Sequence, residues 1–134
     1  MIDFQTEFLN SSVAVIKARG RLDESARKYF FCCLSDLMRE AEKTGTPKHV
    51  IVECNGLGSL SSSGMAALLA ARTMIRKSGG KIYFTHLSSI IATALELTKL
   101  NTLLAIYPTT EDVLRKIDQK EQRYLETEHS AIVH

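Results

Sequence analysis

The order of the elements expected along this chain predicts an α/β fold, in which a single domain is built around a mixed five-stranded sheet with flanking helices. Three observations lead to this prediction. The first apolar residues alternate with polar ones, later apolar residues recur every three to four positions, and the two patterns follow one another in the order β-β-α-β-α-β-α-β-α. Residues 1–118 are expected to form the domain, and residues 119–134 a C-terminal helical extension or a frayed tail.

Five segments have the pattern of strands. They are residues 2–8, 13–18, 49–54, 81–85 and 103–107. In the first segment apolar and polar residues alternate, which predicts a strand with one buried face. The short polar stretch 10–12 favours a turn, so the first two strands are expected to form an antiparallel hairpin. The third segment has few polar breaks and is expected to be a central strand.

Capping residues precede the helices expected between and after these strands. Asp23 or Ser25 can cap the first helix, and Ser88 can cap the third. Residues 109–112 resemble a capping box before the last helix. Glycine-containing stretches follow the first and second helices and are expected to end them, because glycine accepts the left-handed conformation of a helix C-cap.

Composition and charge exclude several classes of function. Lys plus Arg number 17 against 15 Asp plus Glu, and a net charge of +2 is too small to favour nucleic acid or an anionic membrane as a partner. No apolar run approaches the about 20 residues needed to span a bilayer, and the first residues lack the pattern of a signal peptide. Cys32, Cys33 and Cys54 form no metal-binding pattern with the histidines, so neither a metal nor a cofactor is expected. Three unpaired thiols suit the reducing cytoplasm.

The segment from Asn55 to Gly64 is expected to be a loop that leads from the third strand into the second helix. It follows the carboxyl end of a strand, where binding sites gather in α/β sheets. A phosphate on a serine there would be stabilised by the unpaired N–H groups and the macrodipole of the helix start. Ser, Asn and Gly are also the residues that ordinary loops and caps prefer, and Ser63 is a candidate cap. Composition alone therefore leaves both an ordinary loop and a phosphoserine switch open.

Two catalytic motifs are absent from the sequence, and one basic cluster is present. There is no G-x-S-x-G nucleophile elbow and no G-x-x-x-x-G-K-[ST] phosphate-binding loop, which argues against a serine hydrolase and a P-loop nucleotide-binding protein. Arg72, Arg76 and Lys77 cluster on the second expected helix. Such a cluster is usually a solvated face, and a contact to an acidic partner is the alternative.

Several motifs in one order resemble the STAS family, which includes the anti-sigma-factor antagonists and their relatives. The motifs are Gly20-Arg21-Leu22-Asp23, the hydrophobic strand 50–53, the turn 61–64, the small-residue helix 65–69, the glycine pair before Lys81, and residues 94–100, 103–107 and 110–114. The resemblance covers roughly residues 1–118. It implies a mixed sheet with flanking helices, and a binding module that is not an enzyme.

The resemblance also implies a mechanism and a site. In the antagonists, the unphosphorylated protein binds an anti-sigma factor, itself an ATP-using serine kinase, and so frees the sigma factor. Phosphorylation breaks the complex, and a separate phosphatase restores it. The acceptor serine follows an acidic residue, which places it at Ser62. Because Ser61 stands in place of that acid, Ser61 and Ser63 are the alternative acceptors. The implied partner-binding residues are Asp23, Gly58, Ser59, Ser61, Ser62, Ser63, Gly64 and Met65.

A second function is open within the same family. STAS-like domains also occur as scaffolds or adaptors of stress-signalling assemblies and of lipid-transport ABC complexes, where they bind a partner without being phosphorylated. Treatment with a candidate kinase and ATP distinguishes this function from the phosphorylated switch.

Overall fold

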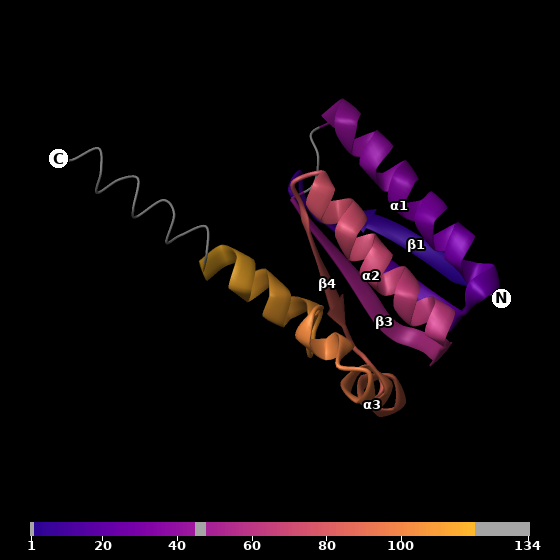
Figure 1. Ribbon diagram of the computed structural model, residues 1–134. Helices are drawn as coiled ribbons and strands as arrows, with labels where there is room; N and C mark the ends of the chain where they lie inside the picture. Colours follow the sequence, from indigo (N-terminus) through magenta and orange to yellow (C-terminus); the bar gives the residue numbers. More distant parts are fainter. Residues whose placement is uncertain (1, 45–47, 120–134) are drawn as a thin grey trace.

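Five strands form one sheet in the order β1-β2-β3-β4-β5 in the computed structural model, which describes residues 2–44 and 48–119 (Figure 1). The strands are β1 (Asp3–Phe8), β2 (Val13–Leu22), β3 (His49–Leu60), β4 (Lys81–Thr85) and β5 (Ala105–Tyr107). β1 pairs with β2 in the antiparallel sense, and the other three pairings are parallel. The sequence predictions of a mixed sheet, an N-terminal hairpin and a central third strand are confirmed.

Helices follow the strands in the expected alternation. They are α1 (Glu24–Thr44), α2 (Ser62–Lys77), α3 (Ser89–Leu97), the 3₁₀ turn η1 (Leu100–Thr102) and a C-terminal helix over residues 110–119. α1 and α2 lie side by side along one face of the sheet (Figure 1). Asp23 caps α1 through a 3.1 Å bond from the Ala26 N–H, and Ser88 caps α3. Ser88 was the predicted cap of α3, and Asp23 was one of two predicted candidates for α1, with Ser25 the other.

The sheet has apolar residues on both faces, and β2 shows how they divide. Ala14, Ile16 and Ala18 belong to the large core under α1 and α2, whereas Val13 and Val15 belong to a second, smaller core. The residues that complete the second core are Ile51, Tyr83, Val113 and Ile117. Because side chains alternate along a strand, two buried faces require the nearly continuous apolar run that β2 and β3 have.

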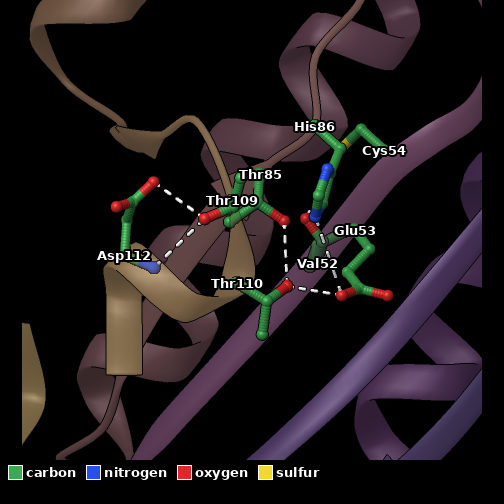
Figure 2. Close-up of polar contacts among 8 residues, drawn as sticks. All are labelled: Val52, Glu53, Cys54, Thr85, His86, Thr109, Thr110 and Asp112. Carbon is green, nitrogen blue, oxygen red and sulfur yellow. Dashed lines mark hydrogen bonds and ion pairs between the residues drawn. The ribbon is translucent and has the colours of Figure 1, made fainter. Parts of the chain in front are cut away.

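A chain of polar contacts joins the C-terminal helix to the sheet (Figure 2). The hydroxyl of Thr110, at the helix start, donates to the Glu53 carboxylate of β3 and lies 3.4 Å from the hydroxyl of Thr85 in β4. His86 Nε2 lies 4.0 Å from the same carboxylate. The Glu53 side chain is 17% exposed, so these contacts satisfy a largely buried carboxylate.

The predicted capping box of this helix is confirmed. The Thr109 hydroxyl accepts the Asp112 N–H at 3.2 Å and donates to the Asp112 carboxylate at 2.8 Å. Donation from Thr109 and then Arg115 lowers the pKa of Asp112 below its ordinary value. The helix start is therefore fixed by its own residues as well as by β3.

Three strand boundaries differ from the sequence predictions by two or more residues. β2 continues to Leu22 and β3 to Leu60, so residues 55–60 are strand and not loop. The reason is tertiary, because β2 and β3 pair along their full length and supply the hydrogen bonds that Gly-rich residues would otherwise lack. β3 carries an extra residue at two points of this ladder. Gly20 of β2 lies at the second point, and its φ is 109°. β5 begins at Ala105 because η1 precedes it.

Two further sequence predictions concern the C-terminal tail and Cys54. Residues 120–134, most of the predicted extension, lie outside the described residues. Cys54 is buried as expected for a core residue, and burial raises the pKa of its thiol to about 12. Within residues 2–44 and 48–119, no helix has the length and apolar character needed to cross a membrane.

Candidate functional site

β2 and β3 end side by side, and their ends place two helix starts next to each other. The last paired residues are Leu22 and Leu60. The next residue, Ser61, donates its backbone N–H to the Leu22 carbonyl at 3.2 Å. α1 begins at Glu24 and α2 at Ser62, so both helices start within two residues of this junction.

Gly64 lets the first turn of α2 lie directly on the end of β2. A Cβ atom at this position would stand 2.1 Å from the Leu22 carbonyl oxygen and 2.8 Å from a methyl of Leu60. Cβ atoms in proteins do not come this close to other atoms, so only glycine allows α2 to approach β2 in this way. The glycine in the predicted serine turn therefore fixes where α2 begins.

Ser61 is the N-cap of α2. Its Oγ accepts the Gly64 N–H at 3.0 Å and lies 3.4 Å from the Leu22 carbonyl, to which it donates. The backbone of Ser61 is extended, as a capping residue requires. The prediction that Ser63 is the cap is wrong, because the strand runs further than expected and the helix begins two residues earlier.

The three consecutive serines therefore differ in what their hydroxyls do. Ser61 uses its hydroxyl to hold the helix start. Ser63 is half-buried, whereas Ser62 is exposed at the first helical position. No hydrogen bond to the Ser62 hydroxyl is formed by any residue in the described part of the chain. Ser62 alone combines exposure with an uncommitted hydroxyl.

The charges around this junction favour an anion at the start of α2. The first turn of α2 contains no acidic residue, so the partial positive charge of the helix dipole is not neutralised there. Nearby, Asp23 accepts from the Ser25 hydroxyl at 2.6 Å and from the Ala26 N–H, and these bonds lower the pKa of its carboxyl. Asp23 thus stays ionised at neutral pH. Arg21 Nε donates to the Ser59 hydroxyl at 3.3 Å.

Most of the sequence-predicted site residues meet at this end of the sheet. Asp23 begins α1, Ser59 lies across from Arg21, and residues 61–65 form the cap and first turn of α2. Gly58 lies inside β3 and not in a loop, with the Gly20 carbonyl 3.9 Å from where its Cβ would be. It is exposed and belongs to the edge of the group.

An exposed apolar stripe on α3 extends the site and was not predicted. Ile90 is 77% exposed and Leu97 is 81% exposed, and their spacing of seven puts them on one helix face. The Thr98 hydroxyl, next to Leu97, lies 3.7 Å from Met65 Sδ in α2. A sequence signal existed, because both residues fall outside the stripe formed by the buried Ile91 and Leu95.

No group of three or more His, Cys, Asp or Glu side chains within residues 2–44 and 48–119 is arranged to hold a metal ion. The chemistry available at the junction consists of an exposed hydroxyl, free backbone N–H groups and a small apolar surface. These features suit modification by, and contact with, another protein.

Gly64→Ala is expected to destabilise the protein by at least about 2 kcal/mol, because the added methyl group collides with the Leu22 carbonyl. Gly58→Ala is the matched control, since its methyl would meet only the Gly20 carbonyl at an ordinary 3.9 Å. Urea unfolding of both variants measures the difference. Equal stability of the two would contradict the close approach of α2 to β2.

Ser61→Ala is expected to cost about 1 kcal/mol of unfolding free energy, since it removes the cap of α2. Ser61→Asp is expected to recover most of this loss, because aspartate also accepts the Gly64 N–H but cannot donate to the Leu22 carbonyl. The same urea measurement on Ser63→Ala serves as the control. A loss at Ser63 as large as the loss at Ser61 would show that the cap is assigned to the wrong serine.

The fold is shared with several solved structures. An anti-sigma factor antagonist from Mycobacterium paratuberculosis matches with a TM-score of 0.73 and 19% identity, over 88% of this chain and 95% of that one. The phosphorylated form of the Bacillus cell fate determinant SpoIIAA matches with a TM-score of 0.62 and 19% identity, over 86% and 99%. A sulfate transporter family protein from Wolinella succinogenes matches with a TM-score of 0.68 and 16% identity, over 84% and 90%.

No curated protein matches this chain in sequence. The model of the STAS domain family does match, over residues 6–113, a span that contains the whole sheet after its first three residues and the start of the C-terminal helix. Since this span is most of the chain, and since the observed fold is the one that the motifs predicted, the protein belongs to the STAS family.

Proposed function

We propose that this protein is an anti-sigma-factor antagonist, a non-catalytic switch that binds an anti-sigma factor and is released by phosphorylation at Ser62. Membership of the STAS family supports the proposal, and so does the fold shared with proteins described as anti-sigma factor antagonists. The anti-sigma factor is expected to be an ATP-using serine kinase, and a phosphatase is expected to reverse the modification. Residues 1–118 form the domain that performs this binding.

The observation that carries the proposal is that the Ser61 hydroxyl caps α2 whereas the Ser62 hydroxyl is exposed and uncommitted. A kinase needs a hydroxyl that it can reach and that is not held by another bond. Ser62 is exposed and uncommitted, and Ser61 caps α2 beside it. Ser61 stands where the family motif has an acidic residue and caps α2 there, and serine and aspartate both accept the N–H bond of a helix start.

A phosphate on Ser62 would change the charge of the junction more than its shape. It adds a charge of about −2 at neutral pH, where the helix dipole and the free N–H groups stabilise it. The ionised Asp23 lies on the neighbouring helix start. The modified surface would therefore present two anionic groups to a partner that had bound a serine and a single carboxylate. Desolvating the phosphate on binding costs several kcal/mol, which favours dissociation.

The partner surface that we propose combines the junction with the stripe on α3. Ser62 provides its polar edge, and Met65 links the junction to Thr98 at the end of α3. Ile90 and Leu97 on α3 provide the exposed apolar area. Buried apolar anchors surrounded by polar residues are the usual composition of a protein interface. The predicted contact residues Asp23, Ser59 and Gly58 are near the same end of β2 and β3 and are included in the proposed surface.

Incubation with the organism's anti-sigma kinases and ATP is expected to add one phosphoryl group to the protein, and none to Ser62→Ala, as read by intact mass. Ser62→Ala is expected to bind the kinase as the unmodified parent does. Ser62→Asp is expected to bind more weakly, since it places a charge at the helix start, although aspartate imitates phosphate only in part. Ser63→Ala, which should be modified normally, is the matched control.

The second candidate function is an unmodified scaffold, and the absence of an acidic residue at position 61 favours it. An unchanged mass with every kinase tested, together with equal binding by Ser62→Ala and Ser62→Asp, would establish the scaffold and overturn the switch. Modification at Ser61 or Ser63 in place of Ser62 would contradict the assignment of the acceptor.

Ile90→Asp and Leu97→Asp are each expected to weaken binding of the anti-sigma factor by at least tenfold, because each places a charge in the apolar part of the surface. Both side chains are largely exposed, so thermal stability should change little. Tyr29→Asp on α1, where the side chain is 63% exposed, is the control and should bind normally. Isothermal titration calorimetry gives the affinities. Normal binding by both α3 variants would remove α3 from the surface.

A further inference from the structure

A groove of about 450 Å³ opens at the other end of α2, between that helix and the edge of the sheet formed by β4 and β5. The residues of its lining that bear on its chemistry are Arg72, Arg76, Lys81, Ile82, Leu103 and Leu104. Arg76 follows Ser62 by fourteen positions, or about 21 Å along a helix. The groove is therefore separate from the proposed phosphorylation site.

The groove is positively charged, and no acidic residue neutralises it from nearby in the chain. No Asp or Glu occurs between Glu53 and Glu96, a stretch that contains all of α2 and β4. Arg72 and Arg76 are one helical turn apart, and neither forms an ion pair with any carboxylate that the structure describes. The ammonium of Lys81 lies 5.2 Å from the ring centroid of Tyr83. The two guanidinium groups are therefore the ones available to an anion.

Helix stability accounts for only part of this cluster. Arg76 and Lys77 occupy the last turn of α2, where cations offset the negative end of the helix dipole. Arg72 lies one turn earlier, is half-buried and lines the groove. Its position needs another explanation, and an anionic ligand provides one.

The rest of the lining indicates an acidic peptide and not a small inorganic anion. Ile82 and Leu104 are buried, and Leu103 is 50% exposed on the groove. Apolar surface of this kind adds nothing to the binding of a phosphate ion but favours a ligand that carries apolar side chains as well as carboxylates. β5 is the last strand of the sheet, so its outer edge offers backbone groups to an extended chain.

We propose that this groove binds an extended acidic segment of a partner protein, in which carboxylates pair with Arg72 and Arg76 and an apolar side chain packs on Leu103. Guanidinium groups bind carboxylates through paired hydrogen bonds, which gives such a site specificity as well as affinity. The site lies outside the Ser62 junction, so a phosphate on Ser62 would not occupy it.

Fluorescence anisotropy with a labelled peptide of alternating glutamate and leucine tests the proposal on the full chain. We expect saturable binding that weakens as salt is added, because charges on an exposed surface are screened. The matched glutamine–leucine peptide should not bind. Arg72→Gln/Arg76→Gln should lower the affinity at least tenfold, and Arg72→Gln alone should still lower it at least threefold. The single variant leaves the cations of the last turn in place, so helix stability is kept.

Lys28→Gln/Arg39→Gln is the control, since it removes the same charge from exposed positions on α1. Its affinity should stay within twofold of the parent. Equal losses in the two double variants, or undiminished binding by Arg72→Gln, would overturn the proposal, because attraction would then be non-specific. Equal binding of a glutamate–serine peptide would overturn the apolar contact, and displacement of the peptide by inorganic phosphate at equal affinity would indicate a small-anion site instead.

Discussion

The parallel pairing of β2 with β3 is the interaction on which the rest of this structure depends. The ladder runs from the pair Val13 and His49 to the pair Leu22 and Leu60, and β2 and β3 are each longer than the other three strands. Both helices that cover the main core start where this ladder ends, and the Leu22 carbonyl accepts from the Ser61 backbone at that point. If the ladder ended earlier, Gly64 would have no carbonyl to approach and the junction would not form.

This arrangement separates two roles that one residue type could fill. Capping needs a hydroxyl or carboxylate turned back toward the helix, and the Ser61 hydroxyl accepts the Gly64 N–H in this role. Modification needs a hydroxyl turned toward solvent, and Ser62 is the exposed neighbour. The replacement of an acidic residue by serine at position 61 is therefore compatible with an intact helix start. What it changes is the local charge, which is less negative before modification than in a protein with aspartate there.

Opposite ends of α2 have different surroundings, because its start lies at the junction of β2 and β3 and its last turns lie beside β4 and β5. Its first turn has small residues and no charge of its own, and its last two turns contain Arg72, Arg76 and Lys77. The C-terminal helix is attached elsewhere, by Thr110 to Glu53, on the second face of the sheet. The two proposed binding surfaces thus include opposite ends of α2, and the second core lies on the other face of the sheet.

Periodicity and capping residues were enough to predict the order of elements, the hairpin, the caps at Ser88 and Thr109, and the burial of Cys54, and they narrowed the cap of α1 to Asp23 or Ser25. The helix caps depend on contacts within a few residues, and the order of elements and the burial of Cys54 follow from local apolar patterns, which a sequence reports directly. The Ile90 and Leu97 stripe was within reach of the same reasoning, since both fall outside the buried positions of α3.

The chain by itself thus determined the order of strands and helices and which serines lie around the start of α2. Only the tertiary structure decided where β3 ends, which serine caps the helix and which is left exposed. The physical reason is that residues 55–60 have poor strand propensity and become strand through hydrogen bonds to β2, a partner more than 30 residues away in sequence. Local sequence does not contain that pairing, and the roles of Ser61 and Ser62 follow from it.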